Sequence, residues 1–419
     1  MAITDRWHKS RPSDHEPRCP EHDLVPTDVH GKGHRWQVRY RDDTGRQRKQ
    51  NFPKKLGKDP STCASAFEAK IRDQLNTDTY LDPDNGKIAF RAYATQWREA
   101  LTLDQVSLEN IDSRFKVHVY PLIGDQMIGT LAKRPSLVQA WIKRMEKELG
   151  LSPTTIRDTV GWVSAVFAAA VDDSIVAKNP CQAGSIRRPK VVPKRAVPWT
   201  LERVEAVSDA LPDDLAALPF LGAGCGLRQG ELFGIAVDDV DFLGRTLRVD
   251  RQVRIVDRRL VFRFPKGGKT RTVSLPDAVS LCLAAHIKQH PPITVTLPWH
   301  TPDGVPTTVK LLFTNGRAGV WERNRFSSLW HAAREKAGAP GGRENGLHVL
   351  RHTAASAWLA QGVDIRTVAE FLGHSDPAFT LRVYSHLMPD AADRARKAMD
   401  AFFNPGDAES ALGVPSGGA

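Results

Sequence analysis

The chain has 419 residues, which corresponds to about two or three domains of ordinary size. Hydrophobic residues make up 41% and charged residues 26% of it, so a fibrous or wholly disordered chain is excluded. The 59 Lys and Arg outnumber the 48 Asp and Glu, and the net charge of +11 favours a polyanionic partner, either nucleic acid or an anionic membrane surface.

Two further features concern the compartment. No stretch approaches the roughly 20 apolar residues of a membrane-spanning helix, and residues 1–13 carry Arg6, Lys9 and Arg11 without the apolar core of a secretory signal. Five cysteines in a chain of this length argue against a disulfide framework. We therefore expect a cytoplasmic protein.

Residues 1–30 are rich in His, Pro and charged residues, which predicts a flexible N-terminal segment. His15, Cys19, His22 and His30 lie close together along it, but a single Cys without a C-x2-C pair is not the spacing of a zinc finger. We interpret these residues as loop residues and predict no metal site, while the sequence leaves open whether they bind zinc.

Residues 31–82 change in character. Trp36, Val38 and Tyr40 alternate with basic and polar residues, which predicts a strand, and residues 46–52 predict a second strand beyond a turn. A helix is predicted over residues 65–75. Between residues 31 and 60, ten Lys and Arg against three Asp and Glu give a local charge of +7. We expect an arm-type DNA-binding domain, a small sheet with a basic face backed by a helix. The alternative is a solvated charged hairpin.

Residues 88–182 are periodic in apolar residues throughout and predict a helical, core-binding domain. Ser152 followed by Pro153 marks the start of one of its helices. Residues 183–198 are predicted to be a basic linker, because residues 186–195 hold five basic residues, two prolines and no acidic residue.

Residues 199–403 are predicted to form the last folded domain, mostly helical, with strands at 246–256, 259–264 and 271–275. These strands suggest a small three-stranded antiparallel sheet. Residues 404–419 are rich in Gly, Ser, Ala and Pro and predict a disordered tail. The fold class expected for the whole chain is therefore α+β and multidomain.

Two short motifs near the start of the last domain carry charged groups beside glycines. In G-L-R-Q-G-E-L, Gly226 can end a helix, and Glu231 follows Arg228 by three residues, so it can orient the Arg228 side chain from the same helical face. In P-K-G-G-K-T-R, a Gly-Gly turn between two strands holds out Lys266 and Lys269.

Two further motifs lie towards the C-terminus of the same domain. In H-V-L-R-H, His348 and Arg351 are three residues apart and share a helical face. In L-G-H-S-D-P, a Gly suited to a helix end precedes His374, and Asp-Pro suits the cap and first turn of the next helix. Tyr384 lies about two turns along that helix.

Together these groups suit phosphodiester transesterification. Two arginines can clamp the non-bridging phosphate oxygens and neutralise the charge that grows in the transition state. A tyrosine can act as the nucleophile if a base or a positive field helps to remove its proton. A histidine can act as that base, and a lysine can protonate the departing 5′ oxygen.

The motifs G-L-R-x-x-E-L, H-x-L-R-H and L-G-H-S, with the tyrosine and histidine that follow, resemble those of the tyrosine recombinase (phage integrase) family. The resemblance covers residues 199–403 in detail and residues 88–195 in layout, and residues 31–80 resemble the arm-binding domain of many phage integrases. It implies the following roles. The scissile phosphate is bound by Arg228 and Arg351. The general acid is Lys266, with Lys269 as its rival. His348 is a general acid and base, His374 hydrogen-bonds the phosphate, Glu231 supports Arg228, and Tyr384 is the nucleophile.

The family further implies DNA integration by cleavage, strand exchange and religation through a 3′-phosphotyrosyl link, without metal or nucleotide cofactor. We expect a phage integrase, or the integrase of an integrative element, that acts as a tetramer on core-type and arm-type DNA sites in a bacterial host. A host DNA-bending protein and a phage directionality factor are expected helpers for viral genome integration and excision. The alternatives are a type IB topoisomerase-like enzyme and a non-catalytic DNA-binding regulator.

Basic and aromatic residues of the arm-type domain, linker and hairpin are the candidate DNA contacts. They are Arg35, Trp36, Arg39, Arg41, Lys54, Lys55, Arg187, Arg188, Lys190, Lys194 and Lys269. The sequence does not separate contacts to bases from contacts to phosphates.

Overall fold

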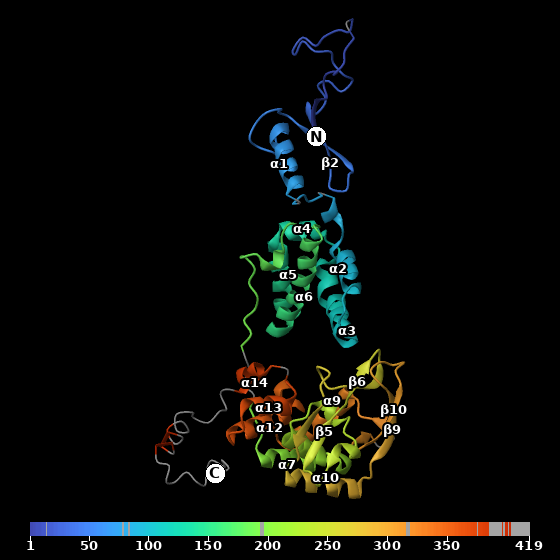
Figure 1. The fold of residues 1–419 in the computed structure, drawn as a ribbon, viewed down its shortest axis with the longest axis vertical. Helices are drawn as coiled ribbons and strands as arrows, with labels where there is room; N and C mark the ends of the chain where they lie inside the picture. Colours follow the sequence, from blue (N-terminus) through green and yellow to red (C-terminus); the bar gives the residue numbers. More distant parts are fainter. Residues whose placement is uncertain are drawn as a thin grey trace, which may run out of the picture. The chain divides into compact units, whose positions relative to one another are not determined.

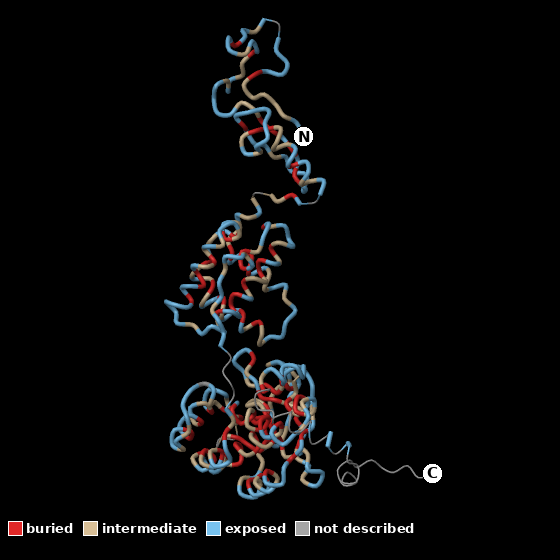
Figure 2. Tube along the Cα trace, turned by 90° about the vertical axis from the view of Figure 1, so that its left-hand side faces the viewer, coloured by how far each residue is buried: buried red, intermediate tan, exposed pale blue. Residues whose placement is uncertain are grey.

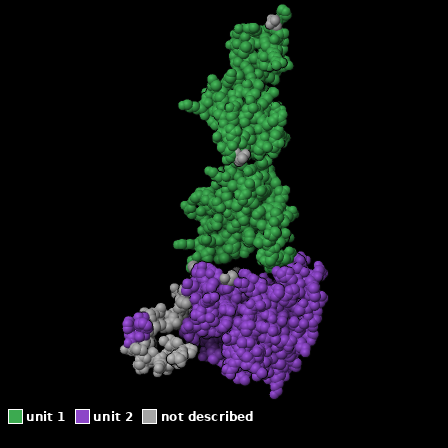
Figure 3. Space-filling model, in the orientation of Figure 1, with its two compact units in different colours: residues 1–192 green, residues 193–419 purple. Residues whose placement is uncertain are grey.

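The computed structural model describes residues 1–13, 15–77, 79–82, 84–192, 197–315, 319–374 and 376–384, with residues 396, 399, 400, 402 and 403. The chain divides into two compact units, residues 1–192 and 193–419 (Figure 3). The tail predicted at 404–419 and the middle of the predicted linker lie outside the described residues. No helix in the described ranges is long and apolar enough to cross a membrane.

The first unit begins with a three-stranded antiparallel sheet, ordered β1-β2-β3, and one helix. Its elements are β1 (Ala2–Asp5), β2 (Trp36–Arg41), β3 (Gln47–Phe52) and α1 (Ala64–Asn76) (Figure 1). Val38 and Phe52 are fully buried in a cluster with Ala64 and Ile71 of α1, so one face of the sheet packs on the helix. The two predicted strands and the predicted helix are confirmed.

Part of residues 1–30, which were predicted to be a flexible segment, pairs with the rest of the first unit. Ile3 pairs with Val38 across β1 and β2, and Lys9 N donates to Val25 O at 2.9 Å. Thr27 N likewise donates to Trp7 O at 2.8 Å. The strand was not evident because four residues are too few for an alternating pattern, and the pairing partner is more than thirty residues away.

The remainder of the first unit is helical, and its buried residues lie inside the bundle (Figure 2). Trp141, Val163 and Phe167 are buried at its centre, and Ser152 caps the longest helix by accepting from Thr155 N at 3.2 Å. The predicted helical character and the predicted start at Pro153 are confirmed. The elements are η1 (Asn85–Lys87), α2 (Phe90–Glu99), α3 (Gln105–Arg114), the π-helix η2 (Phe115–Gly124), α4 (Ile128–Lys133), α5 (Pro135–Lys147), α6 (Pro153–Asp172) and η3 (Pro180–Gln182).

Helices are also the commonest regular elements in the described part of the second unit. Trp199 stacks on Trp330 with ring centroids 5.6 Å apart, and Leu218, Leu221 and Leu350 are fully buried beside them in one core. The helices are α7 (Leu201–Ala210), η4 (Asp213–Leu215), α8 (Ala217–Cys225), α9 (Gln229–Leu232), η5 (Val237–Asp239), α10 (Asp277–Gln289), α11 (Arg323–Lys336), η6 (Arg343–Asn345), α12 (His348–Ala360), α13 (Ile365–Leu372) and α14 (Pro377–Tyr384).

The strands of the second unit form several small antiparallel sheets. A three-stranded sheet is present, but its order is β4-β5-β8, and β6 and β7 form a separate hairpin. The predicted strand 246–256 is broken at Asp250 and Arg251, where Arg251 Nη2 turns to Asp239 Oδ1 at 3.1 Å. The hairpin of β9 and β10 was not predicted. The strands are β4 (Val240–Asp241), β5 (Thr246–Val249), β6 (Gln252–Val256), β7 (Arg259–Arg263), β8 (Arg271–Ser274), β9 (Ile293–Pro298), β10 (Pro306–Leu311), β11 (Thr314–Asn315) and β12 (Gly319–Val320).

Candidate active site

The candidate active site lies where helix ends of the second unit meet. Arg228 follows the end of α8, Arg351 lies on α12, His374 follows α13, and Tyr384 ends α14. Hydrogen bonds connect the first three of these residues to one another or to the same stretch of backbone. The structure therefore brings together side chains that are separated by up to 156 positions in the sequence.

Two glycines end the helices that precede Arg228 and His374, as predicted. Gly226 and Gly373 are both left-handed, with φ of 66° and 60°. A Cβ on Gly226 would lie 2.9 Å from Cη2 of Trp358, so the position excludes a side chain by space as well as by conformation.

The C-terminus of α13 binds three arginines through three successive carbonyls. Arg271 Nε donates to Phe371 O at 2.7 Å, and Arg351 Nη2 donates to Leu372 O. Arg228 Nη2 donates to the next carbonyl, Gly373 O, at 3.1 Å. Carbonyls at a helix C-terminus lack intrahelical donors and carry the negative end of the helix dipole, so they favour cations.

Glu231 supplies the one carboxylate that pairs with these arginines in the described part of the site. It is fully buried, with Oε1 2.9 Å from Arg228 Nη1 and Oε2 2.6 Å from Arg271 Nη2. Burial by itself would raise the pKa of Glu231, but hydrogen bonds and charges from Arg271 and Arg228 outweigh it and lower the pKa to about 2. Glu231 is thus ionised at neutral pH. The predicted pairing with Arg228 is present in the structure.

Arg351 is buried without a carboxylate partner among the described residues. It is 1% exposed, and besides Leu372 O its guanidinium contacts Gly226 O at 2.8 Å and His374 Nε2 at 3.0 Å. Burial, followed by repulsion from Arg228, lowers its pKa to about 9, so the group stays charged at neutral pH. A buried cation with only neutral partners favours the binding of an anion.

His374 lies between Arg351 and α14. Its Nδ1 is 2.7 Å from Thr380 Oγ1, and Thr380 is buried. Burial and the charges of Arg351 and Arg228 lower the pKa of His374 to about 4, so it is neutral at pH 7. Its contact with Arg351 Nη2 identifies Nε2 as the acceptor and leaves Nδ1–H to donate to Thr380.

Tyr384 is 1% exposed, and its hydroxyl is 2.6 Å from His352 Nδ1. Burial raises the pKa of Tyr384 to about 12, against the opposing effect of Arg351 and Arg228. Burial and the charge of Arg351 lower the pKa of His352 to about 4. The tyrosine is therefore protonated at neutral pH and bonded to a neutral histidine.

His348 is not the partner of the Tyr384 hydroxyl. His348 is exposed, although its ring packs edge-on against His352 with centroids 4.8 Å apart. Partial burial, with the charges of His352 and Arg351, holds the pKa of His348 well below its ordinary value. Its predicted role as general acid and base stays a prediction.

Lys266 and Lys269 lie on an exposed turn between β7 and β8. Gly267 and Gly268 both have positive φ, and Gly268 N donates to Pro265 O at 2.9 Å. Both lysines are exposed, and neither makes a hydrogen bond or ion pair within the described ranges, so no contact fixes the position of either ammonium group. The choice between them stays open.

Comparison with known proteins places these features in a family. Residues 200–390 match the model of the phage integrase family. Tyrosine recombinase XerC of Mycobacterium sp. (strain KMS) is 30% identical over 264 residues, which cover 60% of this chain and 77% of that protein. The chain belongs to the phage integrase family of tyrosine recombinases. It is accordingly a site-specific recombinase enzyme.

Longer but more distant matches agree with this assignment. The recombinase is 23% identical to the integrase of Mycobacterium phage L5 over 79% of this chain and 86% of the relative. The Tn1549 transposon integrase, solved in complex with transposon right end DNA, has a TM-score of 0.63 at 21% identity and covers 75% of this chain and all of its own. A lambda integrase dimer bound to a core site has a TM-score of 0.56 at 16% identity. This match covers 84% of this chain and 92% of the lambda integrase chain. These two structures support the mixed α and β multidomain fold.

Three residues of the recombinase site were missed in the sequence. Arg271 and His352 end the two motifs that contain Lys266 and His348, and their positions next to assigned groups were the available signal. Thr380 had no signal, because its contact with His374 depends on the angle between α13 and α14.

The predicted DNA contacts of the first unit are mostly exposed. Arg39, Arg41, Lys54, Lys55, Arg187, Arg188 and Lys190 are exposed, and Lys194 lies outside the described residues. Arg35 and Lys55 lie over the Trp36 ring at 4.8 and 5.0 Å, and Arg35 is also paired with Asp5. The pairs Arg39 with Lys49 and Arg41 with Gln47 make the face of the sheet opposite α1 basic and polar. Lys49 was not among the predicted contacts.

Glu231→Gln is expected to destabilise the second unit by about 3–5 kcal/mol, because it leaves buried arginines unpaired. In the wild type, the lowered pKa means that the stabilisation is present above pH about 4.3 and is lost as the pH falls towards 2. The variant should lose less stability over that interval. Urea unfolding at several pH values, followed by tryptophan fluorescence, measures both effects.

Glu322→Gln, in a partly exposed pair with Arg325, is the control and should change stability by under about 1 kcal/mol. Equal effects of the two substitutions would contradict the assignment.

Proposed function

We propose that this recombinase integrates a phage or other mobile element by cleaving and rejoining DNA through a 3′-phosphotyrosyl intermediate. The observation that carries the proposal is the buried guanidinium of Arg351, which has no carboxylate partner among the described residues and contacts His374. The Tyr384 hydroxyl, which is bonded to His352, feels the charge of this guanidinium. A phosphodiester supplies the anion that Arg351 lacks. Tyr384 supplies the nucleophile.

In the proposed first step, Arg228 and Arg351 bind the non-bridging oxygens of the scissile phosphate. The phosphate replaces His374 Nε2 as an acceptor for Arg351, so Nε2 can carry the ring proton and donate a further hydrogen bond to the phosphate, with Nδ1 then accepting from the Thr380 hydroxyl. Arg228 is fixed on one side by Glu231 and on the other by Gly373 O, so little reorganisation is needed when negative charge grows on the phosphate. Arg271 does not need to touch DNA, because its guanidinium is 5% exposed and is held by Glu231 and Phe371 O. It acts as a positioning residue for Glu231.

The Tyr384 oxygen then attacks phosphorus, and its proton passes to Nδ1 of His352. In the free protein this transfer is unfavourable, because the pKa of Tyr384 is about 12 and that of His352 about 4. Part of the lowering at His352 comes from the charge of Arg351, which a bound phosphate would offset. Substrate binding would therefore strengthen the base at the moment when it is needed. His348, whose ring contacts His352, is the second candidate acid and base.

The bond from phosphorus to the 5′ oxygen breaks as the tyrosyl bond forms, and the departing oxygen takes a proton from Lys266. The ammonium group lies on the exposed β7–β8 turn, so DNA binding must carry it to the leaving group. Religation is the reverse, with a 5′ hydroxyl of another strand as nucleophile. Because the tyrosyl link conserves the energy of the phosphodiester, the proposed cycle needs no nucleotide cofactor.

We infer double-stranded DNA as the partner of both units. Solved relatives are integrases in complex with transposon end DNA or with a core site. The basic face of the β1-β2-β3 sheet, with Arg39, Arg41 and Lys49, suits arm-type DNA, and the helical part and the second unit suit core-type DNA. Two DNA-binding parts in one chain would raise affinity through effective concentration. We also propose a tetramer on synapsed DNA, with a host DNA-bending protein and a directionality factor as helpers.

Tyr384→Phe is expected to abolish covalent adduct formation while DNA binding changes less than about tenfold, because only the nucleophilic oxygen is removed. The measurement is trapping of a denaturant-resistant adduct on a nicked suicide substrate that carries the boundary repeat of the element. Phe379→Tyr on the same helix, combined with Tyr384→Phe, is the matched control and should not restore the adduct. An adduct formed by Tyr384→Phe would overturn the assignment of the nucleophile. If the wild type relaxes plasmids that have no attachment site, the topoisomerase alternative is favoured. If the wild type forms no adduct, the non-catalytic regulator is favoured.

His352→Gln is expected to slow cleavage about 10²–10⁴-fold with unchanged DNA affinity, because the proton acceptor of Tyr384 is lost. A bound phosphate would offset the charge of Arg351 and move the pKa of His352 from about 4 back towards its ordinary value of 6.5, so the wild-type rate should rise with pH up to about 6.5 and the variant should lose this rise. Single-turnover cleavage rates between pH 5 and 9 provide the test. His348→Gln is the matched control on the same helix. A profile that is lost in His348→Gln and kept in His352→Gln would assign the base to His348 instead.

Lys266→Ala is expected to slow cleavage about 10²–10⁴-fold if this lysine is the general acid, and Lys269→Ala should then be nearly neutral. A substrate with sulfur in place of the 5′ bridging oxygen needs no protonation, because a thiolate is a good leaving group. It should restore the rate of Lys266→Ala selectively. Rescue of Lys269→Ala in its place would assign the acid to Lys269, and rescue of neither would exclude both.

A further inference from the structure

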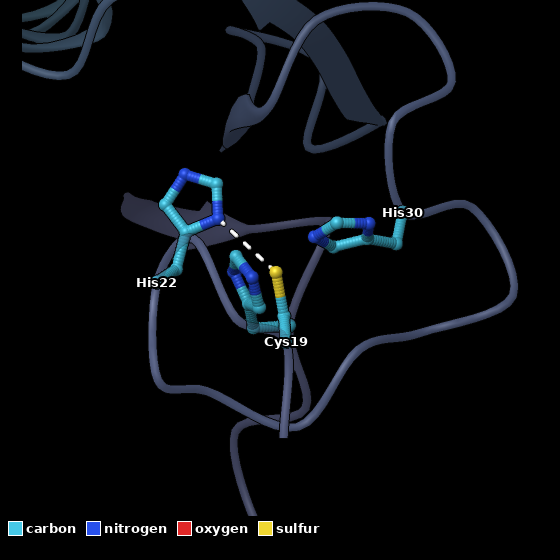
Figure 4. A group of neighbouring side chains, drawn as sticks. Cys19, His22 and His30 are labelled. Carbon is cyan, nitrogen blue, oxygen red and sulfur yellow. Dashed lines mark hydrogen bonds between the residues drawn. The ribbon is translucent and has the colours of Figure 1, made fainter. Parts of the chain in front are cut away.

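We propose that the N-terminal part of the chain holds a structural zinc ion, bound by His8, Cys19, His22 and His30. One ligand atom from each of these residues lies within 4.8 Å of the others. Figure 4 shows the labelled rings of His22 and His30 on either side of the Cys19 sulfur. His15, which the sequence had grouped with the last three, is exposed, and His8 takes its place.

The spacing of the group suits tetrahedral zinc. Cys19 Sγ lies 3.6 Å from Nδ1 of His22 (Figure 4). Zn–S and Zn–N bonds of about 2.3 and 2.0–2.1 Å at a tetrahedral angle place sulfur and nitrogen roughly 3.6 Å apart. Thiolate sulfur and imidazole nitrogen are both ligand types that zinc binds, and four of them complete a tetrahedral site.

Two histidine nitrogens of the cluster have no hydrogen-bond partner among the described residues. His8 Nε2 and His30 Nε2 are buried and make no hydrogen bond in the described structure, and His8 as a whole is 4% exposed. Buried polar atoms of this kind are costly when they are left unpaired. Two of them beside a buried thiol, in one cluster, indicate a missing cation rather than an isolated packing defect.

The hydrogen bond at Nδ1 of His8 determines which ring nitrogen is free to bind a metal. Its Nδ1 lies 2.8 Å from Asp5 Oδ2, and the same carboxylate oxygen accepts from Arg35 Nε at 2.9 Å. A carboxylate at Nδ1 places the ring proton there, so the lone pair of Nε2 faces the cluster. This is the carboxylate–histidine–metal arrangement that orients zinc ligands in proteins.

The local fold also needs a cross-link at this place. Within residues 6–30, His8, Cys19 and Val25 are the described residues that are buried, so no hydrophobic core of useful size forms there. A turn at Cys19–Asp23, with Asp23 N donating to Cys19 O at 2.9 Å, presents Cys19 and His22 together. A zinc ion would join this turn to His8 and His30 and so anchor β1, the edge strand of the sheet.

The direct test is metal analysis of the full-length protein purified without chelator. We expect about one zinc per chain. Replacement by Co²⁺ should give thiolate-to-cobalt charge transfer in the near ultraviolet and the intense visible bands of tetrahedral cobalt. Less than about a tenth of an equivalent of zinc after zinc supplementation, with no cobalt spectrum, would overturn the proposal. A cobalt spectrum without the charge-transfer band would also overturn it, because Cys19 would not be a ligand.

Variants separate this site from other cysteines and histidines. Cys19→Ser and His8→Ala should each lose the zinc, whereas His15→Ala, an exposed histidine of the same segment, should keep it. Zinc kept by both Cys19→Ser and His8→Ala would place the metal elsewhere and overturn the assignment. The Tyr384 adduct on a core-type substrate is measured in parallel. Loss of zinc with the adduct retained would show that the metal site and the proposed chemistry are independent.

Discussion

The C-terminus of α13 is the feature on which the catalytic site depends. Three guanidinium groups lie together there, and their mutual repulsion would disperse them if nothing opposed it. Carbonyls of three successive residues each accept from a different arginine, and the buried carboxylate of Glu231 pairs with two of the three. One carboxylate against three cations leaves an excess of positive charge. The arginines therefore have hydrogen-bond partners that hold them in place, but their positive charge is only partly neutralised. A site with this excess of positive charge favours the binding of a phosphate.

The same geometry explains why the histidines and the tyrosine are neutral in the free protein. Burial together with the excess positive charge lowers the pKa values of His352 and His374 to about 4. Burial raises the pKa of Tyr384 to about 12 even though the arginines oppose it. An unliganded site in this state holds its nucleophile protonated. An anion among the arginines would offset the electrostatic part of the histidine shifts, so the substrate itself would strengthen the base that we propose.

Sequence reasoning succeeded where the signal was local. The glycine ends of α8 and α13, the start of α6 at Pro153, and the clustering of Arg228, Arg351, His374 and Tyr384 follow from short motifs and were predicted. It failed where contacts join distant segments. Arg271 contacts Glu231 and Phe371, which lie 40 and 100 positions away in the sequence. His352, which bonds the Tyr384 hydroxyl, was missed because the role of general acid and base was assigned to His348 of the same motif. Strand β1 and the contribution of His8 also depend on pairing that no local pattern records.

The two units therefore keep polar groups buried by different means. In the second unit, a hydrophobic core that includes Trp199, Trp330 and Leu350 provides the stability, so a charge imbalance can be tolerated at the site. Residues 6–30 lack such a core, and three imidazoles and a thiol meet there with two ring nitrogens unpaired. The described chain offers no hydrogen-bond partner to Nε2 of His8 or of His30, and Nδ1 of His8 is already bonded to Asp5. In the first unit, the zinc ion that we propose would bind the unpaired ring nitrogens of the cluster. In the second unit, a phosphate would neutralise the excess positive charge of the arginines. In both cases the ligand supplies the opposite charge that the buried groups of the chain lack.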